Sequence, residues 1–230
     1  MNRGFTMLEL TIVIAISGLM LGFVLQATKS NQSSECYATT KVQLATVQTA
    51  ITSFVRKNDR YPMPARRDIG VSDANYGREA VAANLTVSGT TTWGALPFQA
   101  LGLPTSFAGD CWGNKFTYVV TTALTTNAAS GGYLDAAVVG TITVKSGAST
   151  TSSTAAAYAV ISQGEDMLNA AALNATSVSW CGTGTTLATY NCYPANSPAT
   201  VANALFNNGK NAGAAYFDDL VIAADRARVI

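Results

Sequence analysis

The feature that most constrains this chain is an uninterrupted apolar run at residues 5–25, FTMLELTIVIAISGLMLGFVL. As an α-helix with a rise of about 1.5 Å per residue, this run would be about 30 Å long, which matches the hydrocarbon core of a bilayer. A helix buried in a globular protein is rarely this long without a polar face. We therefore predict one transmembrane helix over residues 5–25, since no later stretch has the required length.

A cleaved secretory signal peptide is the alternative to a retained helix. Such a peptide has a basic region, a shorter apolar stretch and a small-residue cleavage site after that stretch. Here residues 1–4 precede the run, and the residues that follow it, from Gln26 to Lys29, form no such site. Arg3 favours a cytoplasmic N-terminus, although Lys29 on the other flank weakens this preference. We expect the bulk of the chain to lie outside the cytoplasm.

Glu9 is the one charged residue of the apolar run. A carboxylate in the bilayer costs about 2.5–3.5 kcal/mol on insertion scales. A position near a helix N-terminus and snorkelling towards the interface offset some of this cost. The rest of the cost calls for a cationic partner.

Residues 4–10, GFTMLEL, resemble the GFTLIEL signature of type IV prepilins and of the pseudopilins of type II secretion. The resemblance implies that a prepilin peptidase cleaves between Gly4 and Phe5, which removes residues 1–4 as a leader peptide. It also implies N-methylation of Phe5 and assembly into a helical filament. There the Glu9 carboxylate of one subunit would meet the Phe5 amine of a neighbour. Two unit charges about 4 Å apart attract by about 4 kcal/mol at an effective dielectric near 20, which is comparable with the insertion cost.

Helical periodicity continues beyond the apolar run. A stripe of residues spaced three or four apart predicts that the helix reaches about Asn58 and packs on a globular head: Tyr37, Thr40, Leu44, Val47, Ile51 and Phe54. Residues 26–60 would then form the periplasmic half of the long helix, and residues 61–230 the pilin-like head. Both the missing helix proline and the four-residue leader depart from the family pattern.

Four runs rich in Val, Ile, Thr or Tyr predict strands at residues 115–122, 137–145, 156–163 and 216–223. Residues 65–109 are expected to form a connecting region with short elements, and residues 147–157 a loop. A long helix packed on an antiparallel sheet accommodates this pattern, so we predict an α+β fold of the type IV pilin kind.

A second motif, residues 110–118, DCWGNKFTY, is similar to the D-P-W-G-N-P-Y-x-Y turn of major pseudopilins. Asp110, Gly113 and Asn114 suit a tight turn, and Trp112 could anchor the turn to the core. Cys111 and Lys115 stand where the family often has proline.

The four cysteines are expected to form disulfides, because an even number outside the cytoplasm favours oxidation. Three pairings are possible, and we favour Cys181 with Cys192 and Cys36 with Cys111. A zinc site is the alternative, but the spacing contains no C-x-x-C pair.

Two acidic pairs form a candidate calcium site: Glu165 with Asp166, and Asp218 with Asp219. They resemble, in order, the segments that bind calcium in major pseudopilins, and calcium takes 6–8 oxygen ligands. The alternative is that these carboxylates are solvated turn residues and a strand-edge pair.

Composition excludes several classes of function. The chain has no histidine, so Ser-His-Asp hydrolysis and histidine-ligated zinc are excluded. Its net charge of +1 gives no basic excess for general nucleic-acid binding. The leading hypothesis is a non-enzymatic structural subunit of a type IV pilus or a type II secretion pseudopilus. It would reside in the inner membrane with its head in the periplasm, and later in a periplasmic or cell-surface filament.

The expected partners are copies of the chain, other pilins or pseudopilins, the prepilin peptidase and an inner-membrane assembly platform. The alternative hypothesis is a membrane-anchored, adhesin-like ligand-binding module or an enzyme, in which aromatic side chains would stack on ligands: Trp93, Trp112, Trp180 and Tyr190. Pilus and pseudopilus, and major and minor subunit, remain open alternatives at this point.

Overall fold

A computed structural model describes residues 7–145, 151–165, 172–173, 200–202 and 219–226, and the backbone alone for residues 22–32, 86, 88 and 200–202. The chain divides into two compact units, residues 1–38 and residues 39–230. Helix α1, Met7–Asn58, begins in the first unit and ends in the second. The predicted end of the long helix is therefore confirmed, and Phe5 lies outside the described residues.

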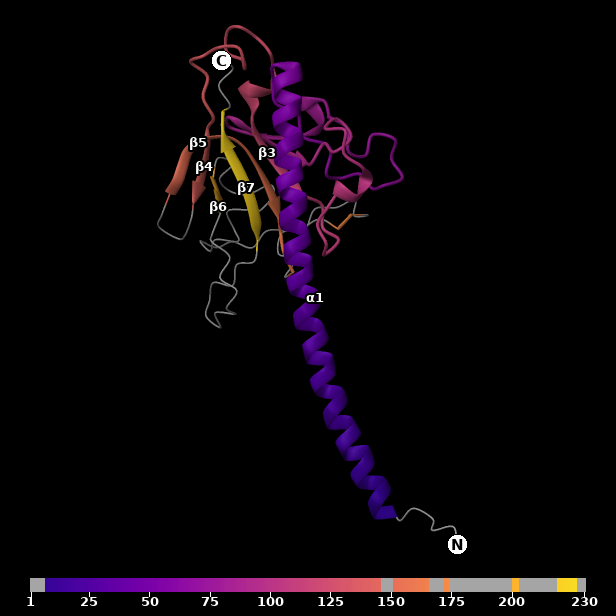
Figure 1. Ribbon diagram of the computed structural model, residues 1–230. Coiled ribbons are helices and arrows are strands. Elements are labelled where there is room, and N and C mark those ends of the chain that lie inside the picture. The colour runs from indigo at the N-terminus through magenta and orange to yellow at the C-terminus, as the bar shows by residue number, and fades with distance from the viewer. Residues whose placement is uncertain (1–6, 146–150, 166–171, 174–199, 203–218, 227–230) are drawn as a thin grey trace. The chain divides into compact units, whose positions relative to one another are not determined.

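The C-terminal half of α1 forms one wall of the head (Figure 1). Its buried positions recur every three or four residues, as expected for a helix that packs on one face: Thr40, Leu44, Val47, Ile51 and Val55. The helix ends at Asn58. The backbone N–H of Asp59 still donates to the carbonyl oxygen of Val55 at 2.9 Å, and the positive φ of Asp59, 49°, then turns the chain out of the helix. Asn58 adds a side-chain bond to the carbonyl oxygen of Phe54 at 2.8 Å.

The described strands of the head form one sheet in the order β1-β2-β3-β5-β4-β6, and β7 also pairs with β5. The strands are β1 (Thr86–Ser88), β2 (Thr91–Ala95), β3 (Thr117–Thr121), β4 (Ile142–Lys145), β5 (Thr151–Ser162), β6 (Thr200–Ala202) and β7 (Leu220–Asp225). Three short 3-10 helices accompany them: η1 (Ala82–Asn84), η2 (Thr105–Phe107) and η3 (Thr122–Thr125). All described pairs are antiparallel except β4 with β6. The α+β architecture predicted from the sequence is confirmed.

The register of the sheet explains how both of its faces are buried. Trp93 of β2 lies opposite Val119 of β3, which lies opposite Ala159 of β5. These side chains share one face and belong to a cluster that includes Ile161 and Val221. The other face carries a tyrosine cluster, which joins the sheet to the segment that follows α1.

In the tyrosine cluster, the ring of Tyr61 lies 5.8 Å from that of Tyr133 and 5.6 Å from that of Tyr158. The ring of Tyr158 lies 6.3 Å from that of Tyr118. All four side chains are buried. Burial raises the pKa of the phenols of Tyr118, Tyr133 and Tyr158 above the ordinary value.

The strand predictions were correct in position and wrong in several boundaries. Strand β3 falls within the predicted residues 115–122, and β4 occupies the end of the predicted residues 137–145. Strand β5 starts at Thr151, so the loop predicted for residues 147–157 was wrong over its second half. Strand β7 overlaps the predicted residues 216–223, of which 216–218 lie outside the described residues. Strands β1 and β2 fall in the region predicted to be a connection.

Candidate functional site

The N-terminal part of α1 carries an apolar surface that nothing in its own unit covers. Every described side chain from residue 7 to residue 21, called here the apolar segment, is exposed. The large apolar members are between 50% and 87% exposed: Met7, Leu8, Leu10, Ile12, Val13, Ile14, Ile16, Leu19, Met20 and Leu21. They point to all sides of the helix, because helical positions separated by one or two residues lie on different faces.

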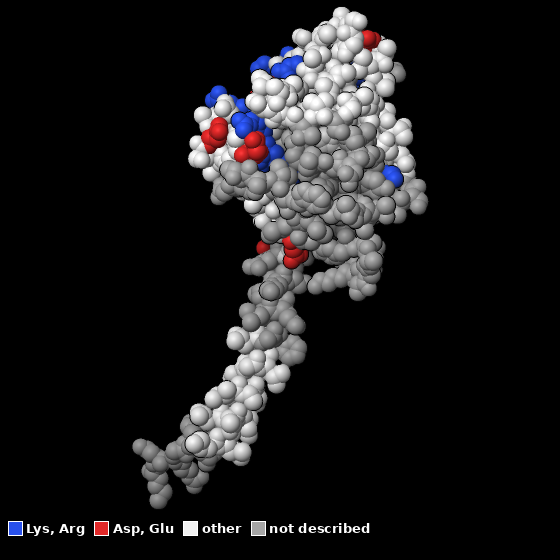
Figure 2. Space-filling view, turned by 180° about the vertical axis from the view of Figure 1, so that it is seen from behind, with Lys and Arg blue, Asp and Glu red and all other residues white. Residues whose placement is uncertain are grey.

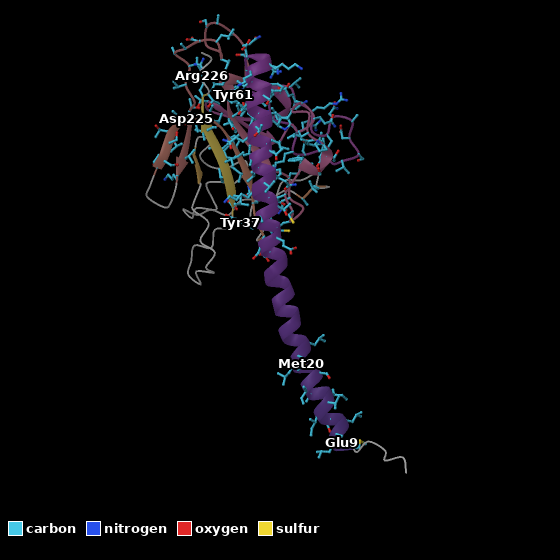
Figure 3. The ribbon with its side chains drawn as sticks, viewed as in Figure 1. Glu9, Met20, Tyr37, Tyr61, Asp225 and Arg226 are labelled. Carbon is cyan, nitrogen blue, oxygen red and sulfur yellow. The ribbon has the colours of Figure 1, made fainter. Side chains whose placement is uncertain are left out.

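Glu9 is the one charged residue of the apolar segment, and its side chain is exposed. Thr11 needs no outside partner, because its hydroxyl donates to the carbonyl oxygens of Met7 at 2.6 Å and Leu8 at 3.1 Å. The face of the segment in view in Figure 2 shows no charged side chain, and Figure 3 marks Glu9 and Met20 along it. The segment can therefore contact lipid or another helix through an apolar surface that has one carboxylate near its N-terminal end.

The predicted processing residues Gly4 and Phe5 lie outside the described residues, so their roles stay predictions. Within the described residues, no helix combines the length and hydropathy that a membrane span requires, so the transmembrane helix over residues 5–25 stays a prediction.

The Asp110 turn predicted from the second motif is present. The Asp110 carboxylate accepts the backbone N–H of Trp112 at 3.1 Å and of Asn114 at 2.9 Å through Oδ1. Its Oδ2 accepts the hydroxyl of Ser162 at 2.7 Å. Burial raises the pKa of Asp110, although these donors act in the opposite direction. The side chain of Asn114 extends the network by donating to the carbonyl oxygen of Gly164 at 3.2 Å.

This turn fixes the end of β5 and lies close to the helix. The backbone N–H of Cys111 donates to the hydroxyl of Thr40 on α1 at 3.3 Å. Trp112 is only half-buried, so the prediction that it anchors the turn to the core was wrong. The buried tryptophan of the described core is Trp93. Trp93 is 2% exposed and therefore cannot stack on a ligand, while Trp180 and Tyr190 lie outside the described residues.

Cys36 and Cys111 are each disulfide-bonded, and no described cysteine is free. Cys181 and Cys192 lie outside the described residues, so the favoured pairings stay predictions.

The candidate calcium residues are only partly described. Asp166 and Asp218 lie outside the described residues, Glu165 is exposed and Asp219 is buried. Within the described ranges, no three His, Cys, Asp or Glu side chains gather as metal ligands would. The hydroxyl of Ser162 and the carbonyl of Gly164 already bond the Asp110 turn. Calcium binding therefore stays a prediction.

The fold buries several polar side chains that were not predicted from the sequence. Arg60 pairs with Glu79, with Nη1 2.6 Å from Oε1, and Glu79 also accepts the backbone N–H of Met63 at 2.6 Å. Lys115 is fully buried and donates to two carbonyl oxygens of the 67–69 segment. No local pattern marks these partners, since they are separated by 16 or more residues.

Comparison with known proteins points to the N-terminal segment. No curated protein and no solved structure shows significant similarity to the chain. A family model described as the prokaryotic N-terminal methylation motif matches residues 1–25. Those residues include Gly4, Phe5 and Glu9, and they contain the whole apolar segment, residues 7–21. The chain therefore carries at its N-terminus the methylation motif that is the signature of type IV prepilins and pseudopilins.

Proposed function

We propose that this protein is a structural, non-enzymatic subunit of a type IV pilus or a type II secretion pseudopilus, polymerised through its N-terminal helix. The observation that supports this most strongly is the exposure of the whole apolar segment, residues 7–21. Covering one Leu or Ile side chain is favourable by about 1.5–3 kcal/mol, so a helix with ten such large apolar side chains needs lipid or other helices around it. In the membrane, lipid would cover these side chains, and in the filament the helices of other copies would cover them.

The methylation motif supports the processing steps of the proposal. A prepilin peptidase would cleave between Gly4 and Phe5, and the new Phe5 amine would be methylated. That amine is a cation in the apolar environment where Glu9 needs one. Pairing between the Glu9 carboxylate of one subunit and the Phe5 amine of the next would offset the cost of burying both charges and set the axial register.

The location and partners follow from the same proposal. The precursor would reside in the inner membrane with its head in the periplasm, and would contact the prepilin peptidase and an assembly platform. The described core of the head, which begins at Thr40 on α1, suits a rigid module displayed on a filament.

Mass spectrometry of the protein purified from its host tests the processing step. The expected mature chain starts at Phe5 and carries a methyl group on its amine. An intact leader peptide, or a cleavage after residue 25, would contradict the proposal.

Electron microscopy of two matched variants tests assembly. Glu9→Leu removes the carboxylate of the apolar segment, whereas Glu35→Leu removes an exposed carboxylate further along α1. We expect Glu9→Leu to reduce filament yield by about tenfold or more, since a lost pair of a few kcal/mol exceeds the 1.4 kcal/mol that corresponds to tenfold. Glu35→Leu should assemble normally. Normal filaments from Glu9→Leu would refute the pairing.

Labelling of intact cells with an antibody against the head distinguishes the two filament types. A pilus places the head on the cell surface, where the antibody binds. A pseudopilus keeps it in the periplasm, where the antibody binds only after the outer membrane is permeabilised.

A further inference from the structure

The head contains a cavity of about 550 Å³ at the end of β7. The loop between η3 and β4 forms one wall with Leu134, Ala136 and Val139, and β5 adds Ala155. Asp225 and Arg226 close the polar end, and both are labelled in Figure 3. Its volume falls within the range of about 300–1,000 Å³ that is typical of small-molecule sites.

The walls of this cavity are held in place without any ligand. Arg226 donates through Nη1 to the carbonyl oxygens of Asp135 at 2.7 Å and Val138 at 2.5 Å, and through Nη2 to that of Tyr133. The Asp135 carboxylate accepts the backbone N–H groups of Gly131 and Ala137, both at 2.9 Å. A loop bonded at five points is pre-organised, so binding would cost little ordering.

The apolar walls have surface that a ligand could cover. Leu134 and Val139 are 49% and 58% exposed although both line the cavity. Exposed large apolar side chains that converge on one concavity are typical of a binding site rather than of scattered surface residues.

The cavity is lined by one charge of each sign, and Asp225 is the one with an atom available to a ligand. The guanidinium of Arg226 is turned towards three carbonyls and lies 5.1 Å from the centroid of the Tyr133 ring. Asp225 is exposed, and its Oδ1 accepts the hydroxyl of Ser153 at 2.8 Å. No ion pair joins Asp225 to any residue that the structure describes, which leaves Oδ2 available to a donor.

We propose that this cavity binds a small organic cation, namely a primary amine carried on an aliphatic or aromatic body. The ammonium group would donate to Oδ2 of Asp225, and the body would cover Leu134 and Val139. A neutral alcohol of the same shape would lose the charge pairing. A carboxylate would gain the least, because Asp225 repels it and both Nη atoms of Arg226 already donate to carbonyl oxygens. This site is separate from the apolar segment, so it stands or falls independently of filament assembly.

Fluorine NMR on the full chain in detergent micelles tests the proposal with three matched probes: 4-fluorobenzylamine, 4-fluorobenzyl alcohol and 4-fluorobenzoate. We expect saturable binding of the amine, about three- to tenfold tighter than that of the alcohol, as for a solvent-accessible ion pair. The benzoate should bind least. Equal binding of all three probes, or no saturable binding of the amine, would overturn the proposal.

Three variants locate the binding. Asp225→Asn should keep the bond from Ser153 while lowering amine affinity to that of the alcohol, and Val139→Trp should fill the cavity and abolish binding of both. Asp73→Asn, a change to a carboxylate outside the cavity, should leave all affinities unchanged. Near-ultraviolet circular dichroism confirms that each variant is folded. Unchanged amine binding by a folded Asp225→Asn or Val139→Trp chain would show that the probe binds elsewhere and refute the assignment.

Discussion

Lys115 is a fully buried lysine whose charge makes the stability of the head depend on pH. Its ammonium group donates to the carbonyl oxygens of Arg67 at 2.9 Å and Ile69 at 2.7 Å, and lies 5.7 Å from the centroid of the Tyr76 ring. The pKa of Lys115 is lowered from 10.5 to about 8: burial lowers it most, the Arg67 charge also lowers it, and the Asp68 charge opposes both. The two carbonyls therefore do not compensate fully for lost hydration.

The magnitude follows from proton linkage. Below pH 8 the ammonium is charged in both the folded and the unfolded chain, and the folded chain bears the full cost of burying it. Between pH 8 and 10.5 the unfolded chain holds the proton and the folded chain has released it. Stability therefore rises with pH across this window, and the contribution of Lys115 amounts to about 2 kcal/mol between pH 8 and pH 10.

The Lys115→Met variant isolates this contribution. Methionine keeps the approximate length of the side chain and removes the titrating group. It also leaves two carbonyls without their donor, so the test uses the pH dependence of the stability difference and not its sign at pH 7. We expect the free energy of unfolding of the wild-type chain, minus that of the variant, to rise by about 2 kcal/mol from pH 8 to pH 10. This subtraction cancels the titration of tyrosines common to both chains.

Urea denaturation of the full chain in detergent, followed at several pH values, measures this difference. Lys41→Met is the matched control, because Lys41 is an exposed lysine of α1. Its difference from wild type should not change with pH. A flat profile for Lys115→Met would show that Lys115 is hydrated in the folded chain, and a falling profile would show that its carbonyl partners stabilise the charge beyond the cost of burial.

Four further substitutions test the described contacts, each by chemical denaturation. Tyr118→Phe should stabilise the head by about 1 kcal/mol, because the buried Tyr118 hydroxyl has no hydrogen-bond partner among the described residues; a loss of stability would reveal a partner. Asp110→Ala should cost about 3 kcal/mol and Ser162→Ala about 1 kcal/mol, since they remove three and one of the bonds of the turn. Equal losses would contradict this ranking. Asp59→Gly should stabilise by up to about 1 kcal/mol, because glycine adopts the positive φ at the helix end without strain; no gain would indicate a compensating contact of the carboxylate.

The helix and the central strands could be predicted because their signals are local. The buried stripe of α1 has helical spacing in the sequence itself, and β3 is a run of β-branched and aromatic residues. The start of strand β5 could not be predicted from such local signals. Its first residues, TSSTA, have the composition of a loop, yet Thr151 and Ser153 pair with Lys145 and Val144 of β4. Pairing with a neighbour overrides propensity here, as β-propensity depends strongly on context.

The same distinction separates the two candidate sites. The apolar segment is one continuous stretch, so its apolar character and the one carboxylate within it are evident from the sequence. The cavity beside Arg226 gathers residues from the loop around Val139, from Ala155 and from Asp225. Only the antiparallel pairing of β5 with β7 brings Ala156 opposite Asp225, and no local pattern specifies that pairing.

Within six residues, the DCWGNK motif contains roles that follow from local turn chemistry and one that depends on long-range contacts. Asp110 accepts the backbone N–H groups of the turn that it starts, and Gly113 has the positive φ of 85° that the turn requires, so both roles follow from local turn chemistry. Lys115, next in the motif, is expected on the surface from its type alone. It is buried because the carbonyls of Arg67 and Ile69, more than forty residues earlier, converge on it. Lys115 therefore connects the turn to the segment after α1, and the pH profile of Lys115→Met measures the cost of burying its charge there.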